Sequence, residues 1–217
     1  MTKNGDIGKI PTTKTGYVRR YVRDRCLKNP KYREKLNYQL TTDPKIFNLL
    51  RQCFAGAYTH GNNTKIGLKC YDVGSFDFTS SYPSVMLRHK YPCSRFSRLT
   101  VIGVNDLVEM SEKYCTLIHA TLYKVRPKNG IHPLSRHKCH YEQTSLIEDN
   151  GKIVRSDVVE VFLTGIDFLD IRECYEWEEI QIHDFYYAHK NYLPKEIVEC
   201  ILDFYVGKTT LKGVKGK

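Results

Sequence analysis

The sequence predicts an α+β fold in which antiparallel strands alternate with helices. Apolar segments rich in β-branched and aromatic residues come in pairs separated by helical patterns, which favours this class over a doubly wound parallel sheet. Asn150-Gly151 follows Glu148-Asp149 as a strong hairpin-turn signal, and hairpins join antiparallel strands. With 217 residues, 41% of them hydrophobic, the chain can form one large or two small domains.

The first ninety residues are expected to hold helices and one strand. Residues 17–35 are basic and in part helical, after an extended lead-in. Asp43 and Pro44 form an N-cap and first-turn pair, because Asp accepts from free N–H groups and Pro loses none there. Residues 69–78 form a strand candidate, and a helix is expected from about residue 82 to 89. The apolar face of the helix after Pro44 is expected to hold four residues, Ile46, Leu49, Leu50 and Cys53.

The remaining residues are expected to supply most of the sheet. Apolar residues follow one another without alternation in the segment 115–125, which indicates a strand that is buried on both faces. A short helix is expected over residues 107–113. The other candidate strands lie at residues 95–102, 158–163 and 180–188.

Two further helices and a tail complete the pattern. Thr164 precedes Asp167 by three residues, a spacing close to a capping box at the start of a helix. Pro194 starts another helix, in which apolar residues recur at i, i+4 and i+7. Residues 207–217 are basic, contain several glycines and are expected to form a tail.

The charge of the chain is unevenly distributed. The net charge is +10, and residues 1–40 hold eleven Lys and Arg against three acids. Tyrosines interleave with these basic residues, which favours a polyanionic partner, although solvated basic helices are the simpler alternative. Residues 156–184 hold nine acids against one Arg and are expected to face away from DNA or toward a basic partner.

The eight cysteines show no C-x-x-C spacing, and the start of the chain shows no export signal. We therefore expect reduced thiols in an intracellular protein. No apolar run approaches the ~20 residues that a bilayer requires, so no membrane association is expected. His132, His137, Cys139 and His140 lack the paired spacing of zinc modules, and a basic strand or loop facing DNA or solvent is the preferred interpretation over a zinc site.

The octet Asp77-Phe78-Thr79-Ser80-Ser81-Tyr82-Pro83-Ser84 carries the clearest chemical signal. A carboxylate that ends an apolar segment and is followed by a helix can hold a hard cation such as Mg²⁺ through oxygen ligands. The simpler alternative is a surface Asp before an ordinary turn. Asp72 is a second nearby acid and is expected to be a surface or turn residue.

This octet resembles motif A, D-x-x-S-L-Y-P, of family B DNA polymerases, and most closely the protein-primed branch of phages and linear plasmids. Upstream, residues 54–62 resemble the Y-x-G-G/A motif that joins the exonuclease and polymerisation domains in that branch. The order and spacing of the two motifs also fit. Ser81 replaces the usual Leu of the first motif, and Phe54 replaces the usual Tyr of the second.

The resemblance implies a palm-like antiparallel sheet and roles for individual residues. Asp77 and the backbone carbonyl of Phe78 would bind Mg²⁺ at a two-metal site for phosphoryl transfer. Tyr82 would lie under the incoming deoxyribose and exclude ribonucleotides. The other implied nucleotide-binding residues are Ser80, Ser81, Lys208 and Lys212. The implied DNA-binding residues are Phe54, Gly56, Ala57, Thr59, His60 and Asn62.

The resemblance also implies four segments and an incomplete enzyme. Residues 1–56 would form a basic lead-in and helical linker from the exonuclease side, and residues 57–114 the palm segment with motif A. Residues 115–190 would add palm strands and a hairpin-rich inserted subdomain that resembles the first terminal-protein region. Residues 191–217 would lead toward motif B, which the chain lacks, as it lacks motif C with the second metal-binding carboxylate.

We therefore expect part of a DNA-directed DNA polymerase that is inactive by itself. Its expected partners are primer–template DNA, deoxynucleoside triphosphates and a terminal priming protein, and its expected cofactor is Mg²⁺. Two alternatives remain open. The chain is a non-catalytic DNA-binding or protein-binding polymerase remnant, or a metal-dependent nuclease built around Asp72 and Asp77.

Overall fold

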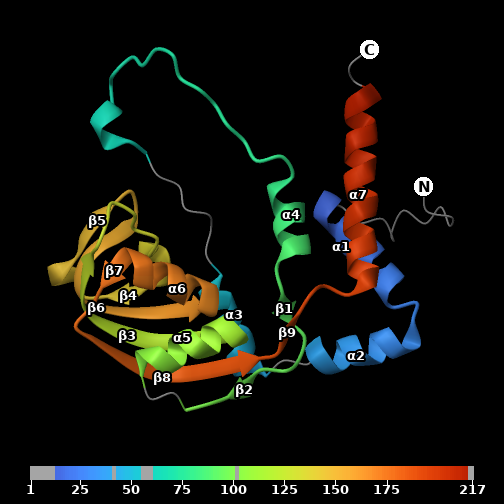
Figure 1. Cartoon of the computed structure of the whole chain (residues 1–217), viewed down its shortest axis with the longest axis horizontal. Coiled ribbons are helices and arrows are strands. Elements are labelled where there is room, and N and C mark those ends of the chain that lie inside the picture. Colours follow the sequence, from blue (N-terminus) through green and yellow to red (C-terminus); the bar gives the residue numbers. More distant parts are fainter. Residues whose placement is uncertain (1–12, 41–42, 55–60, 101–102, 215–217) are drawn as a thin grey trace. The chain divides into compact units, whose positions relative to one another are not determined.

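A computed structural model of the chain describes residues 13–40, 43–54, 61–100 and 103–214 (Figure 1). The chain divides into two compact units, and each is discontinuous in sequence. The first unit comprises residues 1–41, 78–91 and 191–217, and the second comprises residues 42–77 and 92–190. Within the described ranges, none of the helices has the length and apolarity needed to cross a bilayer.

The first unit is helical. Arg25 on one of its helices pairs with Glu199 at 3.2 Å and with Asp203, both on another. Cys26 and Cys200 are buried in the same two helices, which pack together. The helices in the described part of this unit are α1 (Lys14–Cys26), α2 (Pro30–Leu40), α4 (Ser81–Arg88) and α7 (Lys195–Val214). The short strands β1 (Tyr91–Pro92) and β9 (Lys190–Asn191) lie where the chain passes between units.

The second unit is built on an antiparallel sheet in the order β2-β8-β3-β6-β4. Two short strands extend this sheet: β5 pairs with β6, and β7 pairs with β3. The α+β class and the antiparallel sheet with packed helices are therefore confirmed. The strands are β2 (Ser97–Arg98), β3 (Cys115–Pro127), β4 (His140–Tyr141), β5 (Ile147–Asp149), β6 (Lys152–Thr164), β7 (Tyr175–Glu176) and β8 (Glu179–Ala188).

Strand register decides what each face of this sheet carries. Ile118 of β3 lies opposite Leu163 of β6, and His119 lies opposite Phe162. Directly paired residues point to the same face, so Ile118 and His119 point to opposite faces. The face of Ile118 packs against α5 (Val104–Lys113) and α6 (Gly165–Cys174), and the other face packs against α3 (Pro44–Cys53). The described part of this unit also holds the short 3₁₀ turns η2 (Asn63–Lys65), η3 (Arg136–Lys138) and η4 (Gln143–Ser145).

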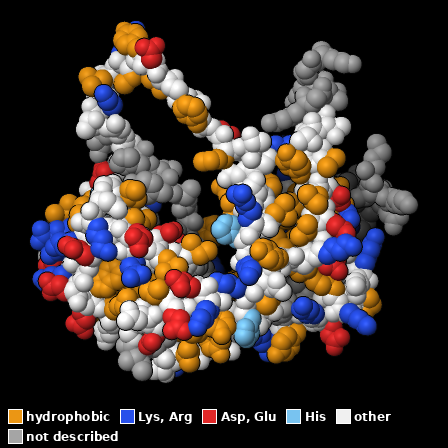
Figure 2. Space-filling view, viewed as in Figure 1, with side chains coloured by type: hydrophobic (Ala, Val, Ile, Leu, Met, Phe, Trp, Pro, Cys, Tyr) orange, Lys and Arg blue, Asp and Glu red, His pale blue; other side chains and the backbone are white. Residues whose placement is uncertain are grey.

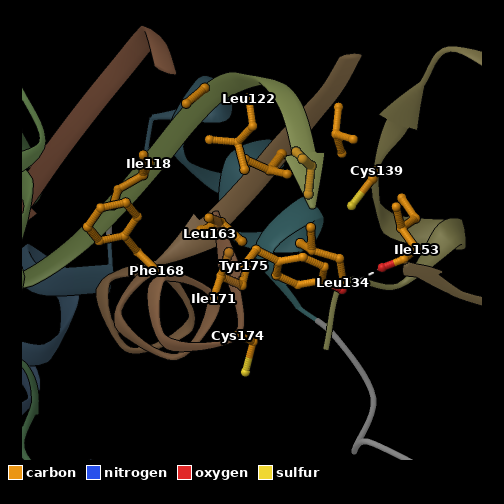
Figure 3. Packing of buried hydrophobic residues seen from close by; sticks show 14 of the residues in the cluster. Ile118, Leu122, Leu134, Cys139, Ile153, Leu163, Phe168, Ile171, Cys174 and Tyr175 are labelled. Atoms are coloured by element: carbon orange, nitrogen blue, oxygen red, sulfur yellow. Dashed lines mark hydrogen bonds between the residues drawn. The ribbon is translucent and has the colours of Figure 1, made fainter. Parts of the chain in front are cut away.

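The main core lies between the sheet and the helices α5 and α6 (Figure 3). Phe168 and Ile171 of α6 pack here with Ile118. Tyr175 is fully buried, and its hydroxyl donates to the Ile153 carbonyl at 2.5 Å. Full burial of such a side chain stabilises the fold by about 1.5–3 kcal/mol, and the hydrogen bond removes the cost of burying the hydroxyl.

The local signals in the sequence form the predicted caps and turn. The Asp43 carboxylate accepts from the Lys45 N–H at 2.6 Å at the start of α3. At the start of α6, the Thr164 hydroxyl accepts from the Asp167 N–H while the Asp167 carboxylate accepts from the Thr164 N–H, as in a capping box. Asn150-Gly151 turns between β5 and β6 with φ of 49° and 72°, the left-handed values that this hairpin turn requires.

The strand predicted over residues 69–78 is wrong. Residues 66–78 form an exposed irregular segment in which Gly67 and Asp72 have φ of 75° and 54°. A strand needs a neighbour to satisfy its backbone groups, and no described residue pairs with this segment. Figure 2 shows hydrophobic side chains along it, at the top of the view. The large apolar residues exposed here include Ile66, Leu68, Tyr71, Val73 and Phe76.

Three smaller predictions also need correction. The helix α7 continues to Val214, so residues 207–214 are not a tail. One interior Gly costs about 1 kcal/mol, which does not stop a helix whose earlier turns pack against α1 and α4. Leu50 is 37% exposed, whereas the other three predicted face residues of α3 are buried. Of the predicted strand at 95–102, residues 95–100 are described, and among these only Ser97–Arg98 (β2) form a strand.

The close contact at Gly165 gives a test of this packing. A Cβ at Gly165 would lie 2.9 Å from the Cβ of Ser111 and would also overlap the Thr116 hydroxyl. We expect Gly165→Ala to lower the free energy of unfolding by about 1–3 kcal/mol in urea denaturation, because the helix must move off the sheet. Gly130→Ala is the control, since nothing lies within 4 Å of its Cβ position. Equal stability of the two variants would contradict this packing.

Candidate functional site

The octet lies at an exposed part of the chain. Asp77 is exposed and ends the irregular segment of the second unit. Phe78 opens the next part of the first unit and is 85% exposed. The Asp77 carboxylate and the Phe78 carbonyl are oxygen donors, the ligand type that Mg²⁺ prefers. The structure therefore leaves the one predicted metal-binding carboxylate accessible to solvent.

The start of α4 has the properties of an anion-binding helix end. Ser80 lies just before the helix with φ of 54°, and its side chain makes no capping hydrogen bond. Its carbonyl accepts from the Ser84 N–H at 3.0 Å, and Pro83 has no N–H to offer. The N–H groups of Ser81 and Tyr82 belong to the first turn, where helical N–H groups lack intrahelical partners and favour anions.

Tyr82 and the helix α7 extend this surface within the first unit. Tyr82 is 79% exposed at the second position of α4, and α4 packs against α7. Lys208 lies exposed on α7, while the side chain of Lys212 lies outside the described residues. Contiguous exposed apolar surface commonly marks an interaction site. The exposed apolar residues of the two helices include Val85, Met86, Tyr205 and Val206.

The predicted DNA-binding residues are only partly described. Phe54 directly follows the last residue of α3 and is 74% exposed. The Asn62 side chain accepts from the N–H and the hydroxyl of Thr64, so it stabilises a local turn. Gly56, Ala57, Thr59 and His60 lie outside the described residues, and their roles stay predictions.

A network of imidazoles and carboxylates lies on the sheet face that carries α3. One Glu160 oxygen lies 2.6 Å from His119 Nε2, and the other lies 2.8 Å from His140 Nδ1. The hydrogen bond from His119, and then that from His140, holds the pKa of Glu160 below its ordinary value, against the opposing effect of burial. Both carboxylate oxygens are therefore satisfied by neighbouring strands.

Asp184 joins the same network from β8. Burial alone would raise its pKa, but Lys45, Arg98 and His119 together hold the pKa below its ordinary value. Lys45 Nζ and an Arg98 guanidinium nitrogen each lie 3.0 Å from its carboxylate, and His119 Nδ1 lies at 3.8 Å. His119 thus lies between two carboxylates, and two cations balance the second.

His132, His137, Cys139 and His140 are the residues for which a zinc site was considered. Among the described residues, no three His, Cys, Asp or Glu side chains are placed to share a metal ion. Burial raises the pKa of the Cys139 thiol to about 12, which disfavours the thiolate that zinc binds. His140 is engaged with Glu160, and His137 and His140 face a cleft together with Lys138. His137, Lys138 and His140 are exposed, as expected for a basic loop, whereas Cys139 is buried.

Comparisons with known proteins identify the fold. No protein-family model and no curated protein matches the chain. Solved structures of phi29 DNA polymerase do match it. The complex with primer–template DNA has a TM-score of 0.61 at 16% identity over 95% of this chain. The complex with primer–template DNA and incoming nucleotides has a TM-score of 0.61 at 16% identity over 90% of this chain. The complex with single-stranded DNA has a TM-score of 0.62 at 15% identity over 94% of this chain.

The chain shares its fold with part of phi29 DNA polymerase. It spans about a third of the length of that polymerase, since it covers 33%, 32% and 32% of the three chains. A polymerase fold is thereby confirmed, while the roles of Asp77, Tyr82 and the other motif residues stay predictions. Sequence reasoning missed the network of His119, Glu160 and Asp184. Only strand register brings these three together, so no spacing in the sequence announces them.

The carboxylates of this network predict acid-sensitive stability. Glu160 and Asp184 have lowered pKa values in the fold, so they add stability above their unfolded pKa, near 4, and lose it as pH falls through the folded pKa. We expect the free energy of unfolding to fall below about pH 4.5. Glu160→Gln should flatten this fall and cost about 1 kcal/mol at neutral pH.

Urea denaturation over a series of pH values measures both effects. Glu179→Gln is the matched control, because Glu179 lies exposed on β8, which pairs with β3 and not with β6. An acid limb of the same slope in Glu160→Gln and the parent protein would show that this network does not govern the fall.

Proposed function

We propose that the chain is part of a DNA-directed DNA polymerase of the family B, protein-primed type, which adds deoxynucleotides to a primer. One observation carries the proposal: a motif-A-like octet opens an exposed helix start in a chain whose fold is shared with phi29 DNA polymerase. The phi29 structures are complexes with primer–template DNA and incoming nucleotides. Primer–template DNA and deoxynucleoside triphosphates are therefore the proposed partners.

Asp77 and the Phe78 carbonyl are the proposed Mg²⁺ ligands of this chain. Both present oxygen donors, and both residues are exposed. When bound, two Mg²⁺ ions would stabilise the attacking and leaving oxygens of phosphoryl transfer. Such a centre needs at least two carboxylates, and the chain lacks the motif that carries the second. The complete site is therefore proposed to include residues outside this chain.

The start of α4 is proposed to bind the nucleotide. The N–H groups of Ser81 and Tyr82 would donate to the triphosphate, with Ser80 setting the left-handed turn that directs them outward. The exposed Tyr82 ring would lie under the deoxyribose, where a 2′-hydroxyl would clash. Lys208 and Lys212 of α7 would add positive charge for the triphosphate or DNA.

The DNA contacts are proposed to come from the segment 54–62 and from the basic residues 1–40. Phe54 is exposed for such a contact, and eleven Lys and Arg in residues 1–40 can displace counterions from phosphates. Residues 115–190 are proposed to include the insertion that contacts a terminal priming protein. The four-segment division, 1–56, 57–114, 115–190 and 191–217, remains part of this proposal.

Nucleotide binding tests the role of Tyr82. We expect dTTP with Mg²⁺ to shift backbone resonances of residues 80–84 in an NMR titration. Tyr82→Ala should weaken the affinity about fivefold to tenfold, because a ring contact of ~1 kcal/mol is lost. Tyr192→Ala is the control, an exposed tyrosine of the same unit. The same loss in both variants, or no shift at residues 80–84, would contradict the proposed site.

Primer extension tests the completeness of the metal site. We expect the purified chain to bind a labelled primer–template without extending it, because one carboxylate cannot hold two ions in place. Denaturing gels after incubation with Mg²⁺ and all four deoxynucleotides give the readout. Extension would show that the site is complete in this chain. Mg²⁺-dependent cleavage that Asp77→Asn abolishes would instead establish the nuclease alternative around Asp72 and Asp77.

A further inference from the structure

A second polar site lies wholly within the second unit, on the sheet face that carries α3. It is a cleft of about 440 Å³ between α3, η3 and the strands β4 and β6. We call it the α3 cleft. The residues that carry the argument are Arg51, Gln52, His137, Lys138, His140 and Phe162.

The α3 cleft carries positive charge, and no carboxylate in its described lining neutralises that charge. Arg51, Lys138 and His137 are exposed, and the described lining holds basic, amide and aromatic side chains without a carboxylate. The nearest acid of the network, Glu160, already accepts from His119 and His140. Asp167 and Asp170 line the adjoining pocket with Lys138, but no ion pair joins them to Arg51 or Lys138 among the described residues. An anion that enters the cleft would therefore meet cations without a direct ion-pair partner, and the amides can donate further hydrogen bonds.

An aromatic ring lies beside these cations. Phe162 stacks on His119 with ring centroids 4.5 Å apart and an angle of 17° between the planes. His140 meets the same ring edge-on at 5.8 Å. Phe162 also packs against the apolar cluster under α3, so the ring is half-buried and held in a fixed orientation. The part of the ring that lines the cleft is the surface on which a base could stack, a contact that does not depend on base sequence.

We propose that the α3 cleft binds single-stranded DNA. Arg51 and Lys138 would bind backbone phosphates while a base stacks on Phe162, the combination of cationic groove and aromatic platform that single-strand sites use. A cleft of about 440 Å³ is the size of a small-ligand site, so a double helix could only lie across its mouth. The site shares no residue with the octet and does not depend on the proposed role of Asp77.

Site-specific cross-linking gives the first test, because the basic residues 1–40 also attract DNA. A short oligothymidylate that carries 5-iodouracil is irradiated with the full chain, and the cross-linked peptides are identified by mass spectrometry. We expect cross-links at residues 160–164 or 137–141. Cross-links confined to the first unit would overturn the proposal.

Affinity measurements with matched variants give the second test. We expect Arg51→Ala with Lys138→Ala to weaken oligothymidylate binding about tenfold or more in fluorescence anisotropy and to reduce its salt dependence. Phe162→Leu keeps an apolar side chain against the sheet and should weaken binding about fivefold through lost stacking. Arg155→Ala with Lys113→Ala removes two exposed charges from the same unit outside the cleft, and it should leave binding within twofold.

Two competitors and one further variant separate the remaining outcomes. A duplex of equal length that binds as tightly and is equally sensitive to the cleft variants would overturn the single-strand assignment. If inorganic phosphate displaces the labelled oligothymidylate as effectively as unlabelled oligothymidylate does, the cleft is a simple anion site and the single-strand assignment is overturned. Tyr82→Ala should leave cleft binding unchanged. If dTTP does not shift residues 80–84 of the parent chain while oligothymidylate still binds the cleft, the proposed polymerase function alone is contradicted. If dTTP shifts these residues while the cleft variants leave oligothymidylate binding unchanged, the cleft proposal alone is contradicted.

Discussion

The pairing of β3 along both of its edges determines the rest of the second unit. β3 pairs with β6 from Leu117 to Val125 and with β8 from Cys115 to Tyr123. The other strands of the sheet attach to these three. A shift of one residue in this register would turn every side chain of β3 to the other face. His119 would then enter the apolar core, and Ile118 would leave it, so the core and the polar network depend on the same hydrogen-bond ladder.

The sequence predicts those parts of the fold that depend on short-range interactions. Asp43-Pro44, Thr164 with Asp167 and Asn150-Gly151 each act within about four residues, and each forms the predicted cap or turn. The segment 69–78 fails as a strand because strand formation depends on a partner, which is a non-local condition. The helix α7 exceeds its predicted end because packing of its earlier turns outweighs the weak preference of one Gly for a break.

The candidate sites follow the same division. The octet could be found from the sequence because its residues are consecutive. The α3 cleft could not, since α3, η3, β4 and β6 contribute one to three residues each and only the fold assembles them. The acidic block at residues 156–184 was expected to face away from DNA or toward a basic partner. Three of its nine acids, Asp157, Glu160 and Asp184, pair with basic groups of their own unit, and the expectation for the block as a whole stays a prediction.

These internal ion pairs affect the electrostatic potential near the α3 cleft more than they affect the free energy of unfolding. Partly exposed pairs contribute about 0–1 kcal/mol each, so they add little to the free energy of unfolding. They do cancel negative charge close to the α3 cleft. Lys45 and Arg98 neutralise Asp184, and two imidazoles satisfy Glu160. The carboxylates of Glu160 and Asp184 therefore do not oppose a polyanion at Arg51 and Lys138.

The segment that leads to Asp77 has neither a second acid of the motif nor a described element that covers its apolar side chains. Its carboxylate has no second acid beside it in the motif, and its apolar side chains are exposed. Ile66 and Leu68 lie two residues apart, as do Tyr71 and Val73, which is the spacing of a strand face interrupted by the left-handed Gly67 and Asp72. The apolar side chains of this segment are exposed because its backbone pairs with no described strand, so no described element covers them.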